Sequence, residues 1–466
     1  MGTLSALMHS SLSALQADQA ALDVTAKNVA NQNTVGYTRE VVQWQAGDSV
    51  SLSNGAEGGV TLGSGPVSQR DRVLEQRVQQ QTQSQTQSAA MESALQQVQN
   101  IFNLSSTTGS PGTTVLGAAT DTFFNSLSAL ANSPADTSTR QSVLTAANGL
   151  AAAFNSAAKQ ISQISAGLDQ KVGSIVGQVN ALTAKVADLN SKITVLPAGV
   201  DGGQLEDQRQ SAIAQLSKLV GLNQISAEHN GISLTTTSGQ VLVGANTAYA
   251  LATTQVNGTT HVIASGGNDI TAGISGGELG GVIAARDTAL PKYMATLDSM
   301  ATAIATNVNQ VNTQGVDAYG SAGQGLFGSQ PGGGVAATLA VTTGDPKKIA
   351  AAAVGEGSAG GTNALALADL NTANLVGGST VATFFASFLN TMGSDTAAAS
   401  ADTVTQQTML TQLTTQRDSL SGVSLDEEAA NLTQYQRSYE AAARVFSIVN
   451  TLMANAINLG QSTTVG

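Results

Sequence analysis

The chain has 466 residues, no cysteine, 11% charged residues and a net charge of −12. This length suffices for several domains with buried cores, while the absence of cysteine excludes disulfides, thiolate chemistry and cysteine-ligated metal. The negative charge disfavours binding to nucleic acid and to acidic membrane surfaces. No apolar run reaches the roughly 18 residues of a membrane span, and the first basic residue is Lys27, so we expect a soluble chain without a cleavable secretory signal.

The first predicted helix covers residues 3–31. Its apolar side chains form a stripe at helical spacing, and four of them recur every seven residues. The stripe consists of Leu4, Met8, Leu12, Leu15, Leu22 and Val29.

The segment "NVANQNTVGY" at 28–37 ends this helical pattern with Asn28, Asn31, Gly36 and Tyr37. Asn and Gly tolerate left-handed backbone angles, and Asn side chains can bond the backbone groups that a helix end leaves unpaired. We therefore expect the chain to leave its first helix here, with Tyr37 at a domain or subunit boundary. An ordinary helix cap followed by a loop fits these residues equally well.

The middle of the chain alternates between helical and extended patterns. Residues 32–69 predict loops and a hairpin-like extended segment, and residues 223–282 show the period of two of a small β unit. A Gly-rich loop region is expected from about 315 to about Pro346. Helical spacing is found from Asp71 to about Phe102 and in the ranges 138–222, 280–314, 363–372 and 379–420.

The last segment begins with a capping box formed by Ser424 and Glu427. Apolar residues then occupy two heptad positions, interrupted only by Glu428. One position holds Leu425, Leu432, Tyr439, Phe446 and Met453, and the other holds Tyr435, Ala442, Val449 and Ala456. Such a run predicts a coiled coil. Because an isolated amphipathic helix is marginal in water, each end of the chain needs a partner, which is either the other end or a second copy.

These patterns predict a mainly α fold with a β insertion. We expect a terminal coiled-coil core domain from residues 1–45 and 424–466, and a helical domain from 46–222 and 283–423. Residues 223–282 are expected to form an inserted, outer β domain that points outward.

The sequence offers no constellation for catalysis. The three histidines, His9, His229 and His261, lie far from any acidic cluster, so surface or packing roles are the better interpretation. The run from Gly323 to Gly328 matches G-x-G-x-x-G but follows no strand and precedes no helix, which favours a glycine-rich loop over a dinucleotide site. Glu427 and Glu428 are best interpreted as negative charges at the N-terminal end of a helix, where they interact favourably with the helix dipole. We expect neither an enzyme, nor a cofactor, nor a metal site.

Both ends of the chain resemble flagellar axial proteins. The pattern N-x-A-N-x-x-T-x-G-Y of rod, hook and hook-associated proteins is matched from Asn28 to Tyr37, with Val35 where many members have Pro. The run "SGVSLDEEAANL" at 421–432 is similar to the ending of the FlgK family of hook-associated proteins. Further stretches, among them "DQRQSAIAQLSKLVG" and "GGELGGVIAARDTALPKYMATLDSMA", extend the resemblance over most of the chain.

This resemblance implies a structural, non-enzymatic protein at the junction between the flagellar hook and filament. The terminal helices would form an inner tube, and copies would assemble with one another between hook protein and the second hook-associated junction protein. The resemblance also implies an export chaperone, flagellar type III export without signal cleavage, and an extracellular location. Assembly contacts are expected at Met8, Leu15, Leu22, Asn28, Val29, Asn31, Gly36, Tyr37, Leu425, Leu432, Tyr435, Tyr439, Phe446, Val449 and Met453.

Two alternatives stay open at this point. A hook or distal-rod paralogue would share the terminal motifs, although the long helical stretch and the run D-E-E-A-A-N count against it. An axial protein with a cell-wall-cleaving domain would need a catalytic carboxylate or a Ser/His cluster, and the middle of the chain shows neither.

Overall fold

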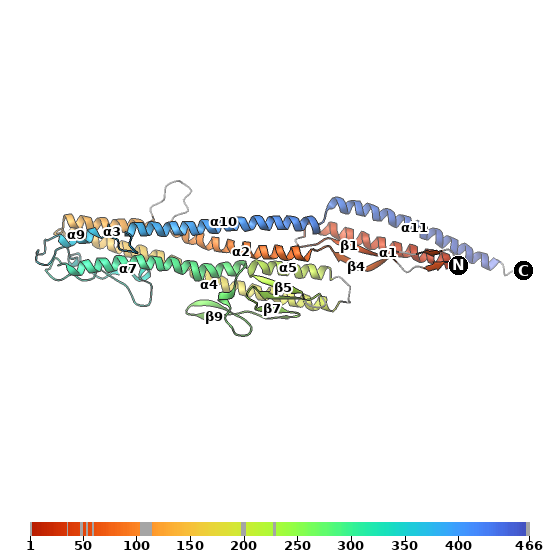
Figure 1. Ribbon diagram of the computed structural model, residues 1–466, viewed down its shortest axis with the longest axis horizontal. Coiled ribbons are helices and arrows are strands. Elements are labelled where there is room, and N and C mark those ends of the chain that lie inside the picture. The colour runs from red at the N-terminus through yellow and green to blue at the C-terminus, as the bar shows by residue number, and fades with distance from the viewer. Residues whose placement is uncertain are drawn as a thin grey trace.

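The computed structural model describes residues 2–34, 36–46, 50–52, 55–57, 60–102, 114–196, 202–226 and 230–462. The molecule is elongated, and long helices run along its length, with both termini at the same end (Figure 1). The small sheets lie beside these helices, so the expected mainly α fold with a β insertion is confirmed. Within the described helices, none combines the length and apolarity needed to cross a membrane.

The two ends of the chain pack against each other. Helix α1 (Gly2–Asn31) lies along α11 (Leu425–Ser462), so the other end of the chain is one of the partners of each terminal helix (Figure 1). Strands β1 (Glu40–Ala46) and β4 (Val60–Ser68) form an antiparallel pair that contacts α1. The ring of Trp44 on β1 lies 6.2 Å from that of Tyr435 on α11, so this hairpin contacts both terminal helices. Strands β2 (Val50–Leu52) and β3 (Gly55–Glu57) pair with each other.

The longer helices of the body, within the described residues, are α2 (Arg72–Ile101), α3 (Val115–Asn132), α4 (Thr137–Thr194), α5 (Gln204–Leu219), α7 (Leu290–Gln314) and α10 (Val381–Ser421). Side-chain caps begin several of them. Asp71 accepts the amides of Val73 and Leu74, and Asp136 accepts those of Ser138 and Thr139. Helix α4 is one continuous helix of 58 residues, and α4 and α5 together occupy most of the range 138–222 in which the sequence shows helical spacing.

Helix α3 is absent from the sequence predictions. Its buried side chains are Leu116, Thr120, Phe123, Phe124, Leu127 and Leu130, which cover one face at helical spacing. This face packs onto α4 and joins the single large core of the body. The rings of Phe102, Phe385 and Phe388 lie in the same core and meet Tyr293 of α7 through Phe388.

The remaining elements of the described chain are short. They are α6 (Gly277–Ala284), the π-helical turn η2 (Ala285–Ala289), α8 (Val335–Thr338), α9 (Thr362–Asp369), the 3₁₀ turns η1 (Thr271–Gly273) and η3 (Pro346–Lys348), and strands β11 (Phe327–Gly328) and β12 (Ala340–Val341). Gly323 lies so close to the Asn312 carbonyl that an added Cβ would clash, and no helix follows it directly. The glycine-rich region expected as a loop between about 315 and 346 is thus partly ordered, because β11, α8 and β12 lie within it.

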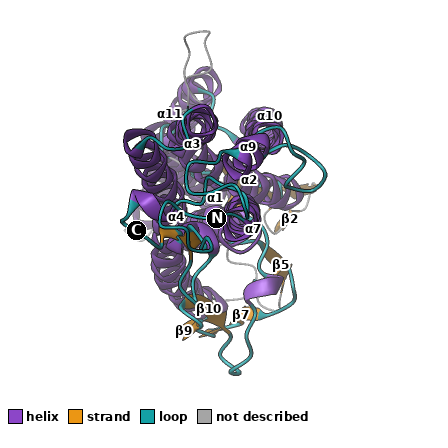
Figure 2. Ribbon diagram, turned by 90° about the vertical axis from the view of Figure 1, so that its left-hand side faces the viewer, coloured by secondary structure: helices purple, strands orange, loops and turns teal. Residues whose placement is uncertain are grey.

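The β module consists of a four-stranded antiparallel sheet and a hairpin. Strands β5 (Leu222–Ser226), β6 (Ile232–Thr236), β7 (Val241–Gly244) and β8 (Thr247–Ala248) pair in sequence order, and β9 (Ala252–Val256) pairs with β10 (Thr259–Ile263). The module lies on one side of the helices (Figure 2). It also shares their core, because buried Leu234, Val243 and Val262 belong to the same apolar cluster as the α4 side chains. The outward module is thus firmly seated on α4.

Candidate functional site

The side chain of Asn28 holds the segment after α1 against that helix through hydrogen bonds. This amide is 1% exposed. Its Nδ2 donates to the Glu40 carbonyl at 2.8 Å, and its Oδ1 accepts the Glu40 amide at 3.0 Å and the Tyr37 hydroxyl at 2.8 Å. The same Nδ2 also lies 3.3 Å from the Glu428 carboxylate at the start of α11. Asn28 therefore connects both terminal helices with β1.

Charged side chains surround this asparagine. Lys27 Nζ lies 2.7 Å from the Glu40 carboxylate, and Arg39 Nε lies 2.7 Å from that of Glu428. Both carboxylates are almost fully buried, at 3% and 1% exposure, so each needs its cation to offset the loss of hydration. Burial, together with the nearby carboxylates, raises the pKa of the Tyr37 phenol, which therefore stays protonated as a donor to Asn28. We call Lys27, Asn28, Tyr37, Arg39, Glu40 and Glu428 the terminal knot.

The backbone brings these residues together through two sharp changes of direction. After α1, a turn bonds the Tyr37 amide to the Thr34 carbonyl, and Gly36 takes a positive φ of 86° that favours glycine. On the other side, α10 ends at Ser421, whose carbonyl accepts the Arg39 amide and whose hydroxyl donates to the Gln69 carbonyl. The knot therefore lies where the terminal helices, the β1–β4 hairpin and the helical body meet.

The expected capping box is formed only in part. The Ser424 hydroxyl accepts the Glu427 amide at a long 3.5 Å, while the Glu427 carboxylate pairs with Arg39 at 3.0 Å. The interpretation of Glu428 as a simple helix-start charge is incomplete, because this side chain is buried against Asn28 and Arg39. Glu428 interrupts a seam of apolar residues, and a polar residue at such a position fixes the pairing register. That interruption is the sequence feature from which the ion pairs could have been inferred.

The apolar stripe of α1 lies beside the intramolecular contact. Ala17, Ala21 and Val24 are buried, together with the polar side chains of Ser11, Asp18, Thr25 and Asn28. Met8, Leu15 and Leu22 are half-buried, and Val29 is exposed. Pairing with α11 and the hairpin therefore uses a face rotated away from the heptad stripe that the sequence shows.

The remaining expected contact residues differ in burial. Asn31 is half-buried and donates to the Lys27 carbonyl of its own helix, and Gly36 is exposed. Val35 and His229 lie outside the described residues. On α11, Val449 is buried, whereas Leu425 and Tyr439 are exposed. The half-buried side chains on that helix are Leu432, Tyr435, Phe446 and Met453.

The histidines with described side chains do not form a reactive cluster. His9 is exposed on α1, and His261 bonds Asp269 at 2.6 Å within the β module. In the part of the chain that the structure describes, no three His, Asp or Glu side chains are arranged to hold a metal ion. The polar groups of the knot bond to one another and join three chain segments, so their role is to hold these segments in place.

Comparisons with known proteins agree with this architecture. The family model for the FlgK helical domain of flagellar hook-associated protein matches residues 95–327. A model for flagella basal body rod protein matches residues 8–38, and one for the C-terminal part of the basal body rod FlgEFG protein matches 415–459. The two shared axial models thus cover the terminal helices, and the more specific model covers the middle of the chain, from the end of α2 past α7.

Similar proteins extend over almost the whole chain. Flagellar hook-associated protein 1 of Escherichia coli is 26% identical, with 98% of this chain and 100% of that protein covered. The protein of the same name from Bacillus subtilis is 28% identical, with 96% of both covered. The structure of the flagellar hook junction protein FlgK from Burkholderia pseudomallei matches with a TM-score of 0.67 at 18% identity, covering 75% of this chain and 100% of that one, which supports the fold.

The names of these relatives are those of a structural flagellar component, which agrees with the expectation of a non-enzymatic protein. The helical-domain model by itself spans half of the sequence. This chain therefore belongs to the FlgK family of flagellar hook-associated proteins, structural components of the bacterial flagellum.

Proposed function

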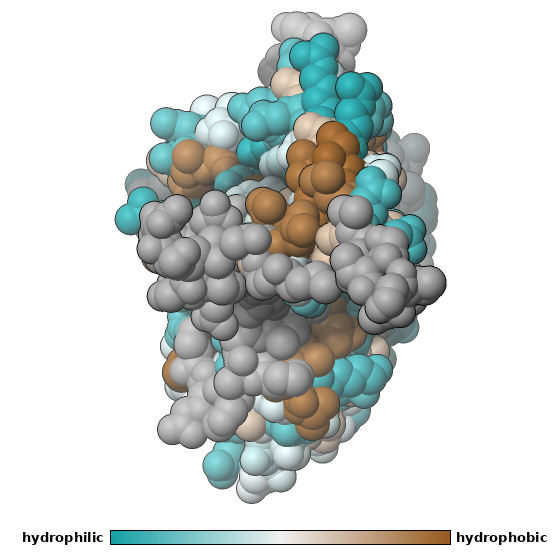
Figure 3. Space-filling view, turned by 90° about the vertical axis from the view of Figure 1, so that its right-hand side faces the viewer, coloured by the Kyte–Doolittle hydropathy of each residue, from teal (hydrophilic) through white to brown (hydrophobic). Residues whose placement is uncertain are grey.

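We propose that this protein is a subunit of the hook–filament junction that assembles with copies of itself. The observation that carries the proposal is apolar surface left over after α1 and α11 have paired. Leu7 and Leu12 on α1, and Val445, Ile448 and Leu452 on α11, are each at least 41% exposed. Brown, apolar surface is visible on the end of the molecule that carries the termini (Figure 3). An apolar helix face of this kind favours a further partner.

A second copy suits this surface because both terminal helices carry it. The half-buried stripe of Met8, Leu15 and Leu22 and the half-buried Phe446 and Met453 are already partly covered by the intramolecular pairing. Each would lose its remaining exposure between neighbouring copies, and full burial of such a side chain stabilises by roughly 1.5–3 kcal/mol. Exposed Leu425, Tyr439 and Val29 extend the same contact toward the knot.

The knot then sets how the terminal helices sit on the body. Asn28, Tyr37 and Glu428 hold the start of α11 against the end of α1 within the terminal unit, and the bond from the Arg39 amide to the Ser421 carbonyl at the end of α10 links this unit to the body. A repeating array requires subunits of the same shape. Asn31 and Gly36 contribute through the turn rather than through the buried bonds.

We propose the same three-part organisation that the sequence suggests, with one boundary shifted. The terminal unit contains residues 1–45 and 424–466, and the contacts of β1 and β4 with α1 support including residues up to 68. The helical domain contains the rest of 46–222 and 283–423. The β unit occupies 223–282, seated on α4.

The proposed neighbours are hook protein on one side and the second hook-associated junction protein on the other. Export through the flagellar type III channel, an export chaperone and an extracellular location belong to the same proposal. The helical-domain match over 95–327 favours this assignment over a hook or rod paralogue, because the terminal models alone would fit either. The same match counts against a cell-wall-cleaving domain, because it assigns residues 95–327 to a helical domain of a hook-associated protein.

The test replaces the cell's own copy with variants of this chain. Ile448→Asp puts a charge on the exposed apolar face of α11, and Thr451→Asp is the matched control, since Thr451 is exposed on the same helix and bonds only its own Ser447 carbonyl. We expect cells with Ile448→Asp to bear hooks without filaments and to release flagellin, while Thr451→Asp swims normally. Normal filaments with Ile448→Asp would contradict the proposal.

A further inference from the structure

Helix α10 carries a long exposed face without charge. Between Asp402 and Arg417 the sequence "TVTQQTMLTQLTTQ" contains no ionisable residue, although most of its side chains are exposed. Exposed helix faces of soluble proteins normally carry charged residues. The centre of this face is formed by the side chains of Val404, Thr405, Thr408, Thr411, Gln412 and Thr415, which we call the threonine ridge.

The ridge can be buried at low cost. The hydroxyls of Thr405, Thr408, Thr411 and Thr415 each donate to the carbonyl four residues earlier in the same helix, at 2.8–2.9 Å. Covering the ridge would therefore leave no threonine donor without a partner, and an unsatisfied buried donor is the main penalty for burying polar groups. The threonine methyl groups and Val404 supply apolar contact area.

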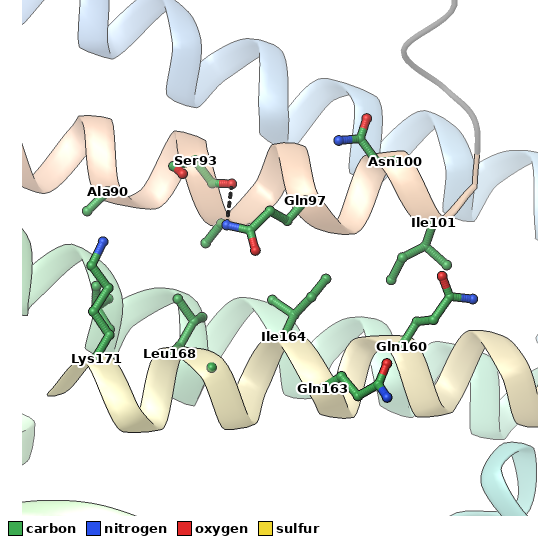
Figure 4. A pocket seen from close by; sticks show the side chains of 13 residues that line it. Ala90, Ser93, Gln97, Asn100, Ile101, Gln160, Gln163, Ile164, Leu168 and Lys171 are labelled. Carbon is green, nitrogen blue, oxygen red and sulfur yellow. Dashed lines mark hydrogen bonds between the residues drawn. The ribbon is translucent and has the colours of Figure 1, made fainter. Parts of the chain in front are cut away.

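A groove between α2 and α4 has complementary properties. It has a volume of about 630 Å³, and amide side chains from both helices line it, among them Gln97, Gln160 and Gln163 (Figure 4). Ile164 and Leu168 contribute apolar surface, and Ala90, Ala94 and Gly167 leave room for a helix backbone to approach. Among the described residues, Lys171 is the one charged side chain that lines it, and it pairs with Glu278 at 2.5 Å.

We propose that the threonine ridge of one copy docks in the α2–α4 groove of the next copy. This inference rests on the proposed function, since it names the surface through which the bodies of assembled copies meet. Each copy carries a net charge of −12, so neighbours repel except where their facing surfaces are uncharged. The ridge is free of charge and the groove has one neutralised lysine, which favours a second copy of this chain as the occupant.

The ridge and the groove lie at different heights along the molecule, so the same contact can repeat from one copy to the next. Contacts of Gln81 with Gln406 and of Ser88 with Asp402 show that the ridge lies beside the first half of α2. The groove uses the second half, from Ala90 to Ile101. The two centres are about 16 residues apart along α2, or roughly 24 Å at the helical rise. Copies joined in this way are staggered along the axis, and a contact between two different surfaces extends into an open array.

The test uses thiol cross-linking, which is clean because the chain has no cysteine. Cells express, as their only copy, a variant with Thr408→Cys in the ridge and Gln163→Cys in the groove, and isolated flagella are treated with a short bismaleimide. We expect a ladder of dimers and higher multiples of this chain. The purified monomer should give no ladder. A control pair, Thr408→Cys with the exposed Thr372→Cys near α9, should also give none.

Charge variants test the contact without a cross-linker. Thr408→Lys and Gln163→Glu should each weaken filament retention without lowering the melting midpoint of the monomer, because both positions are exposed there. The double variant should regain filaments, since the two new charges attract each other across the contact. Rescue together with the ladder supports the proposal. A ladder made only with a different protein, or normal filaments in both single variants, overturns it.

These outcomes are distinguishable from failure of the proposed function. If wild-type chain is missing from isolated flagella, the proposed junction role fails. If the chain is present, filaments are held and neither ladder nor charge effect is seen, the ridge and groove inference fails alone.

Discussion

Replacing Asn28 with alanine should undo the terminal knot while leaving the helical body folded. The side chain makes three neutral hydrogen bonds, two with the Glu40 backbone and one with the Tyr37 hydroxyl, and a longer one to the Glu428 carboxylate. At about 1 kcal/mol for each neutral bond and somewhat more for the charged one, their loss amounts to roughly 4–5 kcal/mol. Because Asn28 and Glu40 are almost fully buried, water cannot readily replace these bonds.

The effect should be confined to the terminal unit, so a local measurement is needed. Hydrogen exchange of the α11 amides reports their opening, and about 4 kcal/mol corresponds to faster exchange by up to about 10³-fold. A second report comes from Trp44, the only tryptophan of the chain, whose ring lies 6.2 Å from Tyr435 on α11. Its fluorescence should shift toward that of a solvated indole when α11 leaves the hairpin.

Asn31→Ala is the matched control from the same motif. Asn31 donates only within its own helix, to the Lys27 carbonyl, and its other bond is with exposed Thr34, so its loss should cost well under 1 kcal/mol. We expect Asn31→Ala to exchange like the wild type. Equal exchange of α11 in Asn28→Ala and Asn31→Ala, or an equally large loss of stability in the helical body, would refute the role of the knot.

The remaining predictions concern the seam, the β module and the terminal unit. Phe446→Asp should leave the thermal midpoint of the body nearly unchanged, since Phe446 is half-buried in the monomer, yet prevent filament attachment; normal swimming or a collapsed midpoint would argue against the seam. The sequence alone suggests that a Gly/Ser linker could replace residues 223–282 and leave motility intact. The shared core predicts instead that this replacement removes several buried side chains, at roughly 1.5–3 kcal/mol each, and strongly lowers the melting midpoint. An unchanged midpoint would show that the β module does not stabilise α4. Bonds from the Thr271 hydroxyl and amide, together with His261, lower the pKa of Asp269 to about 2. That carboxylate therefore stabilises the β module above its unfolded pKa of about 4 and loses this effect as the pH falls toward 2, so Asp269→Asn should flatten the acid dependence measured by circular dichroism. The sequence alone suggests that limited proteolysis of the monomer leaves a fragment from about residue 70 to 420. The contacts of the knot predict instead that the ends are cleaved faster in Asn28→Ala than in the wild type, so equal cleavage of the two would speak against the knot.

Sequence periodicity determined the kinds of elements and their order. The apolar repeats of α1 and α11 are local properties of the chain, because helical spacing requires only that one face be apolar. The same holds for the β period near residues 223–282 and for the terminal motifs that led to the flagellar family. The single large gap was α3, a helix whose regular apolar face was left unassigned even though Leu116 to Leu130 repeat at helical spacing.

Only the tertiary structure decided which face of each terminal helix is used. The heptad positions of α1 predicted Met8, Leu15 and Leu22 as the contact, yet the folded monomer buries Ala17, Ala21 and Val24. Apolar periodicity predicts that one face of a helix is buried, but it does not predict which element packs on that face. Here one such element is the hairpin from residues 40–68. The stripe that the sequence shows most clearly is thereby left half-exposed.

The terminal knot was beyond the sequence for a related reason. Asn28 and Glu428 are 400 residues apart, and although the break in the apolar seam at Glu428 points to a polar contact, the sequence does not tell which residues supply it. Their pairing depends on α10 ending at Ser421 and on the turn at Gly36, which together bring Arg39 between the two ends of the chain. Local patterns fix which residues are helical, whereas a polar contact across the fold exists only after every intervening element has been placed.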